Sequence, residues 1–241
     1  MDHVIKEWGR VPQDMRPAIE EYAALLVELG GENVKGLTVF GAIAAGVFDR
    51  ERQSAANVLM LGRTDLSLLR RFAEYGPKLG DAGIAAPLVM TPEYLDSSRD
   101  TFPLELLEIH QNHTTLWGDD YFAELTLDPA HVRLQCEREL KTMLIRMRQG
   151  LLAAAGRERE LDATIRDVAS ELVRTMRGML WLHDDREAKP AAEVIAGMES
   201  AAARQLHGVR QVAGPDATMD WGSFEALYHD VEALGGIADA W

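Results

Sequence analysis

The sequence predicts an α/β (α+β) domain followed by an all-α helical bundle. Within the first ~125 residues, apolar runs of strand length alternate with segments of helical periodicity, as in α/β and α+β proteins. The pattern changes at Asp128-Pro129, because Asp is a favoured N-cap and Pro a favoured first helical residue. Amphipathic helices follow from there to the end. We therefore expect an α/β domain over residues 1–125 and a helical bundle over residues 126–241.

The first domain begins with a helix over residues 14–30, where Ile19, Tyr22 and Leu26 fall on one face and Gly30-Gly31 marks the end. Apolar runs then predict buried strands. Two short helices are expected between and after them, the first capped by Thr64. The expected strands cover 34–40, 57–61 and 84–91, the helices 64–75 and 92–98, and a fourth extended segment about 102–116.

The second domain is expected to hold four amphipathic helices. Each carries an apolar stripe at helical spacing, and short links join them, which predicts an up-down bundle. The last helix is expected to end at Gly235-Gly236, because glycine is a common residue after a helix. The four ranges are 128–155, 161–180, 190–206 and 221–234.

Composition excludes several classes of function. The formal net charge of -14 repels phosphate backbones, so we expect no binding to extended nucleic acid. The longest mostly apolar run, 36–48, has 13 residues, whereas a membrane span needs roughly 20; no membrane association is expected. The single Cys136 cannot form an intramolecular disulfide, which fits a reducing compartment and predicts a cytoplasmic protein.

The segment from Val39 to Leu61 is the most informative. A predicted strand ends at Gly41, small residues lead to Gly46, and a second predicted strand starts after Ser54. This frame resembles the signature of the polymerase-beta-like nucleotidyltransferase superfamily. In that family a strand ends in Gly-Ser, a small-residue helix follows, and the next strand begins Ser-Asp-x-Asp.

The resemblance implies a site chemistry. The family's glycines let backbone N–H groups approach a triphosphate. Its two Asp, two residues apart on a strand, point to one face and hold the divalent metals that stabilise the attacking and leaving oxygens. In the present sequence Ala42 replaces the serine after Gly41, while Ala55 and Asn57 stand where the two Asp should be. Neither side chain supplies the anionic oxygen that Mg²⁺ requires.

A third family carboxylate lies on a later strand, for which Glu105 or Glu108 is the candidate. Of the two, Glu105 is taken as the candidate metal ligand, although one surviving carboxylate makes a poor two-metal site. The stretch from Phe102 to Asp120 and the helix that follows also look like bacterial nucleotidyltransferase-like proteins of unassigned role. The resemblance covers about residues 18–155. Two other interpretations stay open: Gly41 and Gly46 can serve helix–strand packing, and the segment around Asn57 can have another register without the motif.

We therefore expect a catalytically inactive nucleotidyltransferase-like protein that binds a nucleotide or another phosphate ligand in a cleft between the domains. No cofactor is expected, and Mg²⁺ only if the protein is an enzyme. One alternative is an active nucleotidyltransferase with rearranged metal ligands and a small acceptor such as an antibiotic. Another is an antitoxin-like interaction module. A homodimer surface is expected on the bundle. The expected ligand-binding residues are Gly41, Ala42, Gly46, Ser54 and Asn57, with Arg50, Arg52 and Arg63 as nearby cations.

Overall fold

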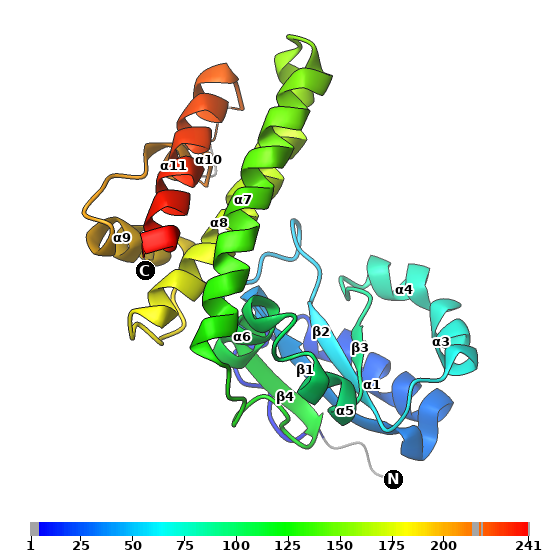
Figure 1. Ribbon diagram of the computed structural model, residues 1–241. Coiled ribbons are helices and arrows are strands. Elements are labelled where there is room, and N and C mark those ends of the chain that lie inside the picture. Colours follow the sequence, from blue (N-terminus) through cyan, green and yellow to red (C-terminus); the bar gives the residue numbers. More distant parts are fainter. Residues whose placement is uncertain (1–4, 214–216, 218, 241) are drawn as a thin grey trace. The chain divides into compact units, whose positions relative to one another are not determined.

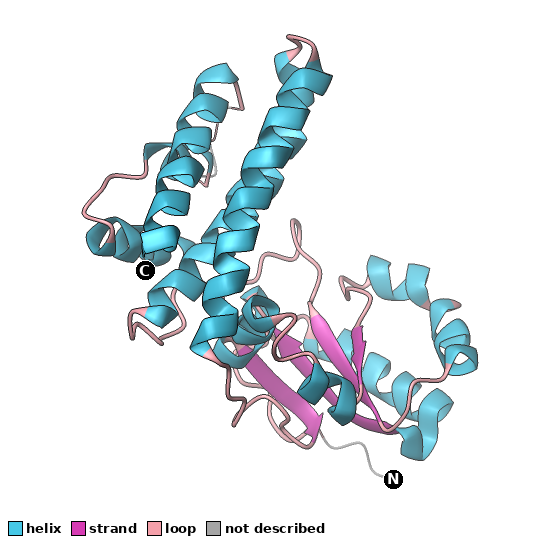
Figure 2. Ribbon diagram, in the orientation of Figure 1, coloured by secondary structure: helices cyan, strands magenta, loops and turns pink. Residues whose placement is uncertain are grey.

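The computed structural model describes residues 5–213, 217 and 219–240. The chain divides into two compact units, Met1–Thr101 with Glu105–Thr126 and Phe102–Leu104 with Leu127–Trp241. The first unit holds a mixed β-sheet with helices, and the second is helical (Figure 2). The expected fold class, a mixed sheet with helices followed by a helical region, is confirmed.

The sheet has four strands in the order β3-β2-β1-β4 (Figure 1). β1 (Val34–Phe40) is antiparallel to both β2 (Asn57–Leu61) and β4 (His113–Gly118), and β3 (Leu88–Met90) is parallel to β2. The bounds of β1 and β2 are the predicted ones, since both are apolar runs that are buried on both faces.

The core of this unit lies between the sheet and two helices, α1 (Arg16–Gly30) and α3 (Leu66–Ala73). Alternate residues of β2 point to this face, as the two-residue period of a strand requires. The N-cap of the helix expected over 64–75 is one residue later than predicted, because Asp65 rather than Thr64 accepts the N–H groups of Ser67 and Leu68. The helix itself ends at Ala73. The buried residues shared by the sheet and these helices include Ile19, Tyr22, Leu26, Leu37, Val39, Ala55, Leu59, Leu61 and Leu68.

The predicted extended segment over 102–116 is wrong for most of its length. Residues Pro103–Gln111 form helix α6, and only then does β4 begin. Leu104, Leu106 and Ile109 of α6 are all buried. A helix that is buried on several sides lacks a clear polar face, so its sequence resembles that of a buried strand. The strand predicted over 84–91 is also shorter, since only Leu88–Met90 pairs as β3. The shorter helices of this unit are α2 (Ala42–Ala45), α4 (Gly76–Asp81) and α5 (Pro92–Ser97).

The described part of the second unit has five α-helices rather than the four expected: α7 (Pro129–Ala154), α8 (Asp162–Leu182), α9 (Ala191–Ala201), α10 (His207–Val212) and α11 (Trp221–Ala240). α7 packs along α8 and α11. α7 starts where it was predicted, with Asp128 accepting the N–H of Ala130 at 2.8 Å. Cys136 is buried on α7, and its thiol donates to the carbonyl oxygen of Thr175 on α8 (3.7 Å).

Two predicted helix ends in this unit are wrong. The helix expected over 190–206 stops at Ala201, and Glu199 holds the turn that follows by accepting the N–H of Leu206 at 2.9 Å and pairing with Arg210 of α10. α11 continues through Gly235-Gly236 to Ala240. The buried Leu234 and Ala238 lie on either side of the glycines, so tertiary packing outweighs the roughly 1 kcal/mol that each glycine costs a helix.

Membrane-spanning helices are not found among residues 5–213, 217 and 219–240, since none of the helices there combines sufficient length with sufficient apolar character.

Candidate functional site

The turn that follows β1 has a backbone that requires glycine. Gly41 lies at φ 70°, ψ -139°, and Gly46, at the other end of the one-turn helix α2, lies at φ 78°. Residues other than glycine are strained at such backbone angles. The Gly41 N–H donates to the carbonyl oxygen of Asn112 at 2.8 Å, which ties the turn to the start of β4. A side-chain carbon added at Gly41 would meet nothing within 4 Å, so neighbouring residues do not cover this side of Gly41.

A cation that sequence analysis missed lies against this turn. Arg10 comes from the segment before α1, and its Nη1 donates to the carbonyl oxygen of Ala45 at 3.1 Å. Its side chain also packs on Gly46, where an added Cβ would lie 3.0 Å from the Arg10 Cδ. Arg10 and Ala45 are 35 residues apart in the sequence, so no local pattern could have brought them together.

The three arginines expected to help are each paired with a carboxylate. Arg50 lies 3.6 Å from Asp14, Arg52 lies 3.6 Å from Asp49, and Arg63 lies 3.8 Å from Asp65, measured between the closest nitrogen and oxygen atoms. Such pairs leave little net positive charge for an anion. Arg10 is therefore the best placed cation for a ligand at the Gly41–Gly46 turn.

Asn57 and Ala55 face the core. Asn57 is 2% exposed and Ala55 is 1% exposed. The Asn57 Oδ1 accepts from the Tyr22 hydroxyl at 3.0 Å, and its Nδ2 donates to the carbonyl oxygens of Ala85 (2.9 Å) and Ala55 (3.2 Å). Burial raises the pKa of the Tyr22 hydroxyl, which keeps this donor neutral. Asn57 was expected among the ligand-binding residues, but α1 covers this face of the strand and the Tyr22 hydroxyl is bonded to the Asn57 amide oxygen.

The other face of the chain at the start of β2 also lacks a carboxylate. The two-residue period places Ser54, Ala56 and Val58 on that side. Ser54 is exposed and Ala56 is half-buried. Residues 54–58 therefore carry no acidic side chain on either face, and they do not fit a site for two divalent metals.

Glu105 lies on helix α6 and not on a strand, which corrects the expectation for the third carboxylate. Glu108 lies on the same helix. The later strand β4 covers His113–Gly118 and carries no carboxylate. In the described ranges 5–213, 217 and 219–240, no three His, Cys, Asp or Glu side chains are grouped so that they could hold a metal.

An imidazole–carboxylate pair lies next to the glycine turn. His113 pairs with Phe40 across β1 and β4, one residue before Gly41. Its Nε2 lies 3.1 Å from Asp120 Oδ1, and its Nδ1 lies 3.0 Å from the carbonyl oxygen of Ile109. Burial alone would raise the pKa of Asp120, but the N–H of Phe122, the His113 ring and the N–H of Ala123 together bring that pKa below its usual range. The pair fixes the start of β4 beside the turn.

Comparison with known proteins bears on the fold. No protein-family model matches the sequence, and no curated protein matches it. Among solved structures, the fold is similar to that of spectinomycin adenyltransferase AAD(9) from Enterococcus faecialis, crystallised with ATP and spectinomycin. The TM-score is 0.57 at 10% sequence identity, and the match covers 93% of this chain and 99% of that chain. The mixed sheet and the helices after it thus have a nucleotidyltransferase-like fold.

Proposed function

We propose that this protein is a nucleotidyltransferase-like nucleotide-binding protein without two-metal transferase activity. One observation carries the proposal: residues 54–58, at the start of β2, present no carboxylate on either face, and Asn57 is held in the core. Without anionic ligands, two Mg²⁺ ions cannot be held at this strand to stabilise the attacking and leaving oxygens. Incubation with labelled nucleoside triphosphates, Mg²⁺ or Mn²⁺ and a panel of acceptors should show no transfer.

The Gly41–Gly46 turn supports nucleotide binding. Its backbone angles are restricted to glycine, its outer side is open at Gly41, and Arg10 lies against it. A guanidinium has five N–H donors, so Arg10 can contact a phosphate while it keeps its bond to Ala45. The solved adenyltransferase of this fold contains ATP, which supports a nucleotide as the ligand class. Because residues 54–58 carry no carboxylate, no metal is needed there to offset repulsion of the phosphates.

Replacing Gly41 by Ala should weaken nucleotide binding at least tenfold, because Ala is strained at φ 70° and the turn must change shape. Gly31→Ala is the matched control. Gly31 lies before β1, at φ 53° and ψ -133°, and it too has no atom within 4 Å of an added Cβ. Both variants should lose a similar amount of stability, on the order of 1–3 kcal/mol, but Gly31→Ala should bind as the wild type does.

Calorimetry and thermal shift with ATP, GTP, CTP and UTP, with and without EDTA, measure this effect. A nucleotide at 100 times its dissociation constant should stabilise the wild type by about 2.7 kcal/mol, and EDTA should change nothing. No shift with any nucleotide at millimolar concentration would favour the interaction module. Binding that needs Mg²⁺, together with turnover, would favour the antibiotic-type transferase with rearranged metal ligands. The homodimer expected from the sequence is a separate prediction, which sedimentation equilibrium tests.

A further inference from the structure

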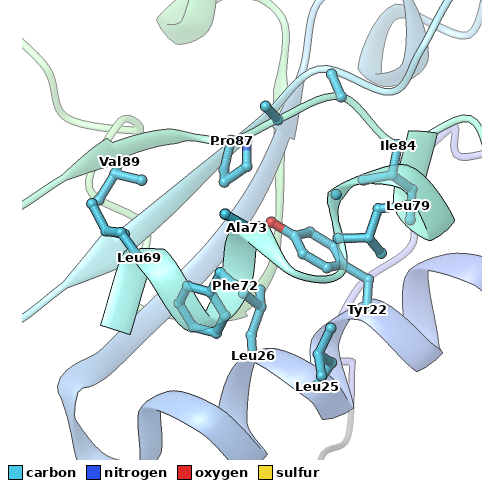
Figure 3. A pocket seen from close by; sticks show the side chains of 13 residues that line it. Tyr22, Leu25, Leu26, Leu69, Phe72, Ala73, Leu79, Ile84, Pro87 and Val89 are labelled. Carbon is cyan, nitrogen blue, oxygen red and sulfur yellow. The ribbon is translucent and has the colours of Figure 1, made fainter. Parts of the chain in front are cut away.

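A pocket of about 250 Å³ lies within the first unit, on the side of the sheet covered by α1 and α3. Its walls come from α1, α3, α4 and the segment 84–89 that leads into β3 (Figure 3). It is separate from the Gly41–Gly46 turn, whose residues do not line it.

The lining is apolar. Of its thirteen residues, Tyr22 alone has a polar side chain, and the others are aliphatic, aromatic, alanine, proline or glycine. Figure 3 shows Phe72 and Leu69 of α3 on one side and Pro87 and Val89 above them, with Leu26 of α1 below. A charged ligand would lose its hydration here and gain no partner, which costs several kcal/mol.

The polar groups on the Tyr22 side of the pocket are already bonded to one another. The Tyr22 hydroxyl donates to Asn57 Oδ1 at 3.0 Å, and Asn57 Nδ2 donates to the Ala85 carbonyl oxygen at 2.9 Å. These bonds join α1, β2 and the segment before β3, so the position of the Tyr22 side chain is fixed before any ligand binds. The Tyr22 oxygen can also accept a hydrogen bond from a ligand.

The size of the pocket narrows the class of ligand. An apolar cavity of roughly 150 Å³ holds benzene, while pockets for drug-sized molecules begin near about 300 Å³. The value here, about 250 Å³, lies between them. Two aromatic rings, Tyr22 and Phe72, line the pocket, and aromatic side chains favour offset or edge contacts with another ring.

We propose that this pocket binds a small, uncharged, mainly apolar molecule of about the size of a bicyclic aromatic ring. The ligand makes ring contacts with Tyr22 and Phe72, and a single N–H or O–H on it can donate to the Tyr22 oxygen. This site is independent of the nucleotide turn, and its occupancy does not depend on the proposed function.

Indole is a suitable probe, since it is bicyclic, uncharged and has one N–H. Calorimetry and ligand-observed NMR should show saturable binding of indole to the full chain. Indole-5-carboxylate, which has nearly the same shape and a charge, should bind at least tenfold more weakly. Ala73→Phe should weaken indole binding at least tenfold, because Ala73 lines the pocket at the end of α3 and a phenyl group there fills it.

Ala24→Phe is the matched control, because Ala24 is exposed on α1 and does not line the pocket. It should bind indole as the wild type does. Ala86→Leu, at another residue that lines the pocket, replaces Ala73→Phe if that variant folds poorly. The proposal is overturned if indole does not bind. It is also overturned if Ala73→Phe binds indole as well as Ala24→Phe does, or if indole-5-carboxylate binds as tightly as indole. Self-association that Ala73→Phe abolishes would place a second copy in the pocket and would also overturn it.

Discussion

Restoring the family's carboxylates, with Ala55→Asp and Asn57→Asp together, should destabilise the fold strongly and should not create a metal site. Both positions face the core and are at most 2% exposed. At position 57 an Asp would place a carboxylate oxygen against the carbonyl oxygens of Ala85 and Ala55, which now accept from the amide. An unpaired buried charge costs about 3–5 kcal/mol, so two of them approach the total stability of a domain.

The matched control moves the same two charges by one residue, with Ser54→Asp and Ala56→Asp. A shift of one residue exchanges the two faces of a strand, and Ser54 is exposed while Ala56 is half-buried. This variant should lose at least ~2 kcal/mol less stability than the buried pair, since neither charge is fully removed from water. Urea denaturation of both variants, monitored by circular dichroism, gives the comparison.

The effect of pH gives a second check. A buried carboxylate has a raised pKa in the folded state, so the folded protein binds protons more tightly than the unfolded chain. The penalty in Ala55→Asp with Asn57→Asp should therefore be largest at neutral pH and should shrink as the pH falls through the folded-state pKa. A variant that folds like the wild type at pH 7 and binds Mg²⁺ would show that this face is open, and the assignment of Ala55 and Asn57 to the core would be wrong.

The second large effect is expected for Gly208→Ala in the helical unit. A Cβ at Gly208 would lie 2.2 Å from the Leu227 nitrogen and 2.3 Å from the Ala226 carbonyl carbon, both backbone atoms of α11. Backbone in a helix cannot yield as a side chain can. A hydrogen bond also holds α10 close to α11, because Asp230 Oδ2 of α11 accepts the Val209 N–H of α10 at 2.9 Å. The variant should lose about 3 kcal/mol or more of stability, because α10 must move away from α11.

Gly235→Ala is the control for this variant. Gly235 lies within α11 itself, and an added Cβ there would meet nothing within 4 Å. Because Ala is a better helix former than Gly, this substitution should stabilise the protein by about 0.5–1 kcal/mol. Thermal unfolding of the two variants, with fluorescence of the tryptophans as the signal, measures the opposite shifts. Equal transition temperatures would contradict the close approach of α10 and α11.

The parts of the fold that the sequence predicted well are governed by local chemistry. β2 contains the apolar run 58–61, with Asn57 before it and Gly62-Arg63 after it, and its bounds, Asn57–Leu61, are the predicted ones. α7 starts at Pro129 because Asp128 and Pro129 are the preferred residues at those two positions. In both cases the residues that decide the structure are neighbours in the sequence.

The parts that could not be predicted depend on distant residues. Asn57 was expected among the ligand-binding residues, but its environment is set by Tyr22, which is 35 residues away and on another element. Arg10 reaches the glycine turn over the same separation. Most of the extended segment expected at about 102–116 is helix α6. Its apolar residues are buried on several sides, which the local pattern does not distinguish from a buried strand. Tertiary contacts decide each of these cases.

The buried Cys136 gives the helical unit an internal reporter of local opening. Burial raises the pKa of this thiol to about 12, and its Sγ faces Thr175 on the neighbouring helix α8. Alkylating reagents attack the thiolate, so the closed form should be almost inert at neutral pH and each modification event should record a separation of α7 from α8. Since Cys136 is the single cysteine of the chain, the rate of labelling under excess reagent measures the free energy of that opening without any mutation. The same thiol would then distinguish a ligand that stabilises the helical unit from one that acts on the α/β unit alone.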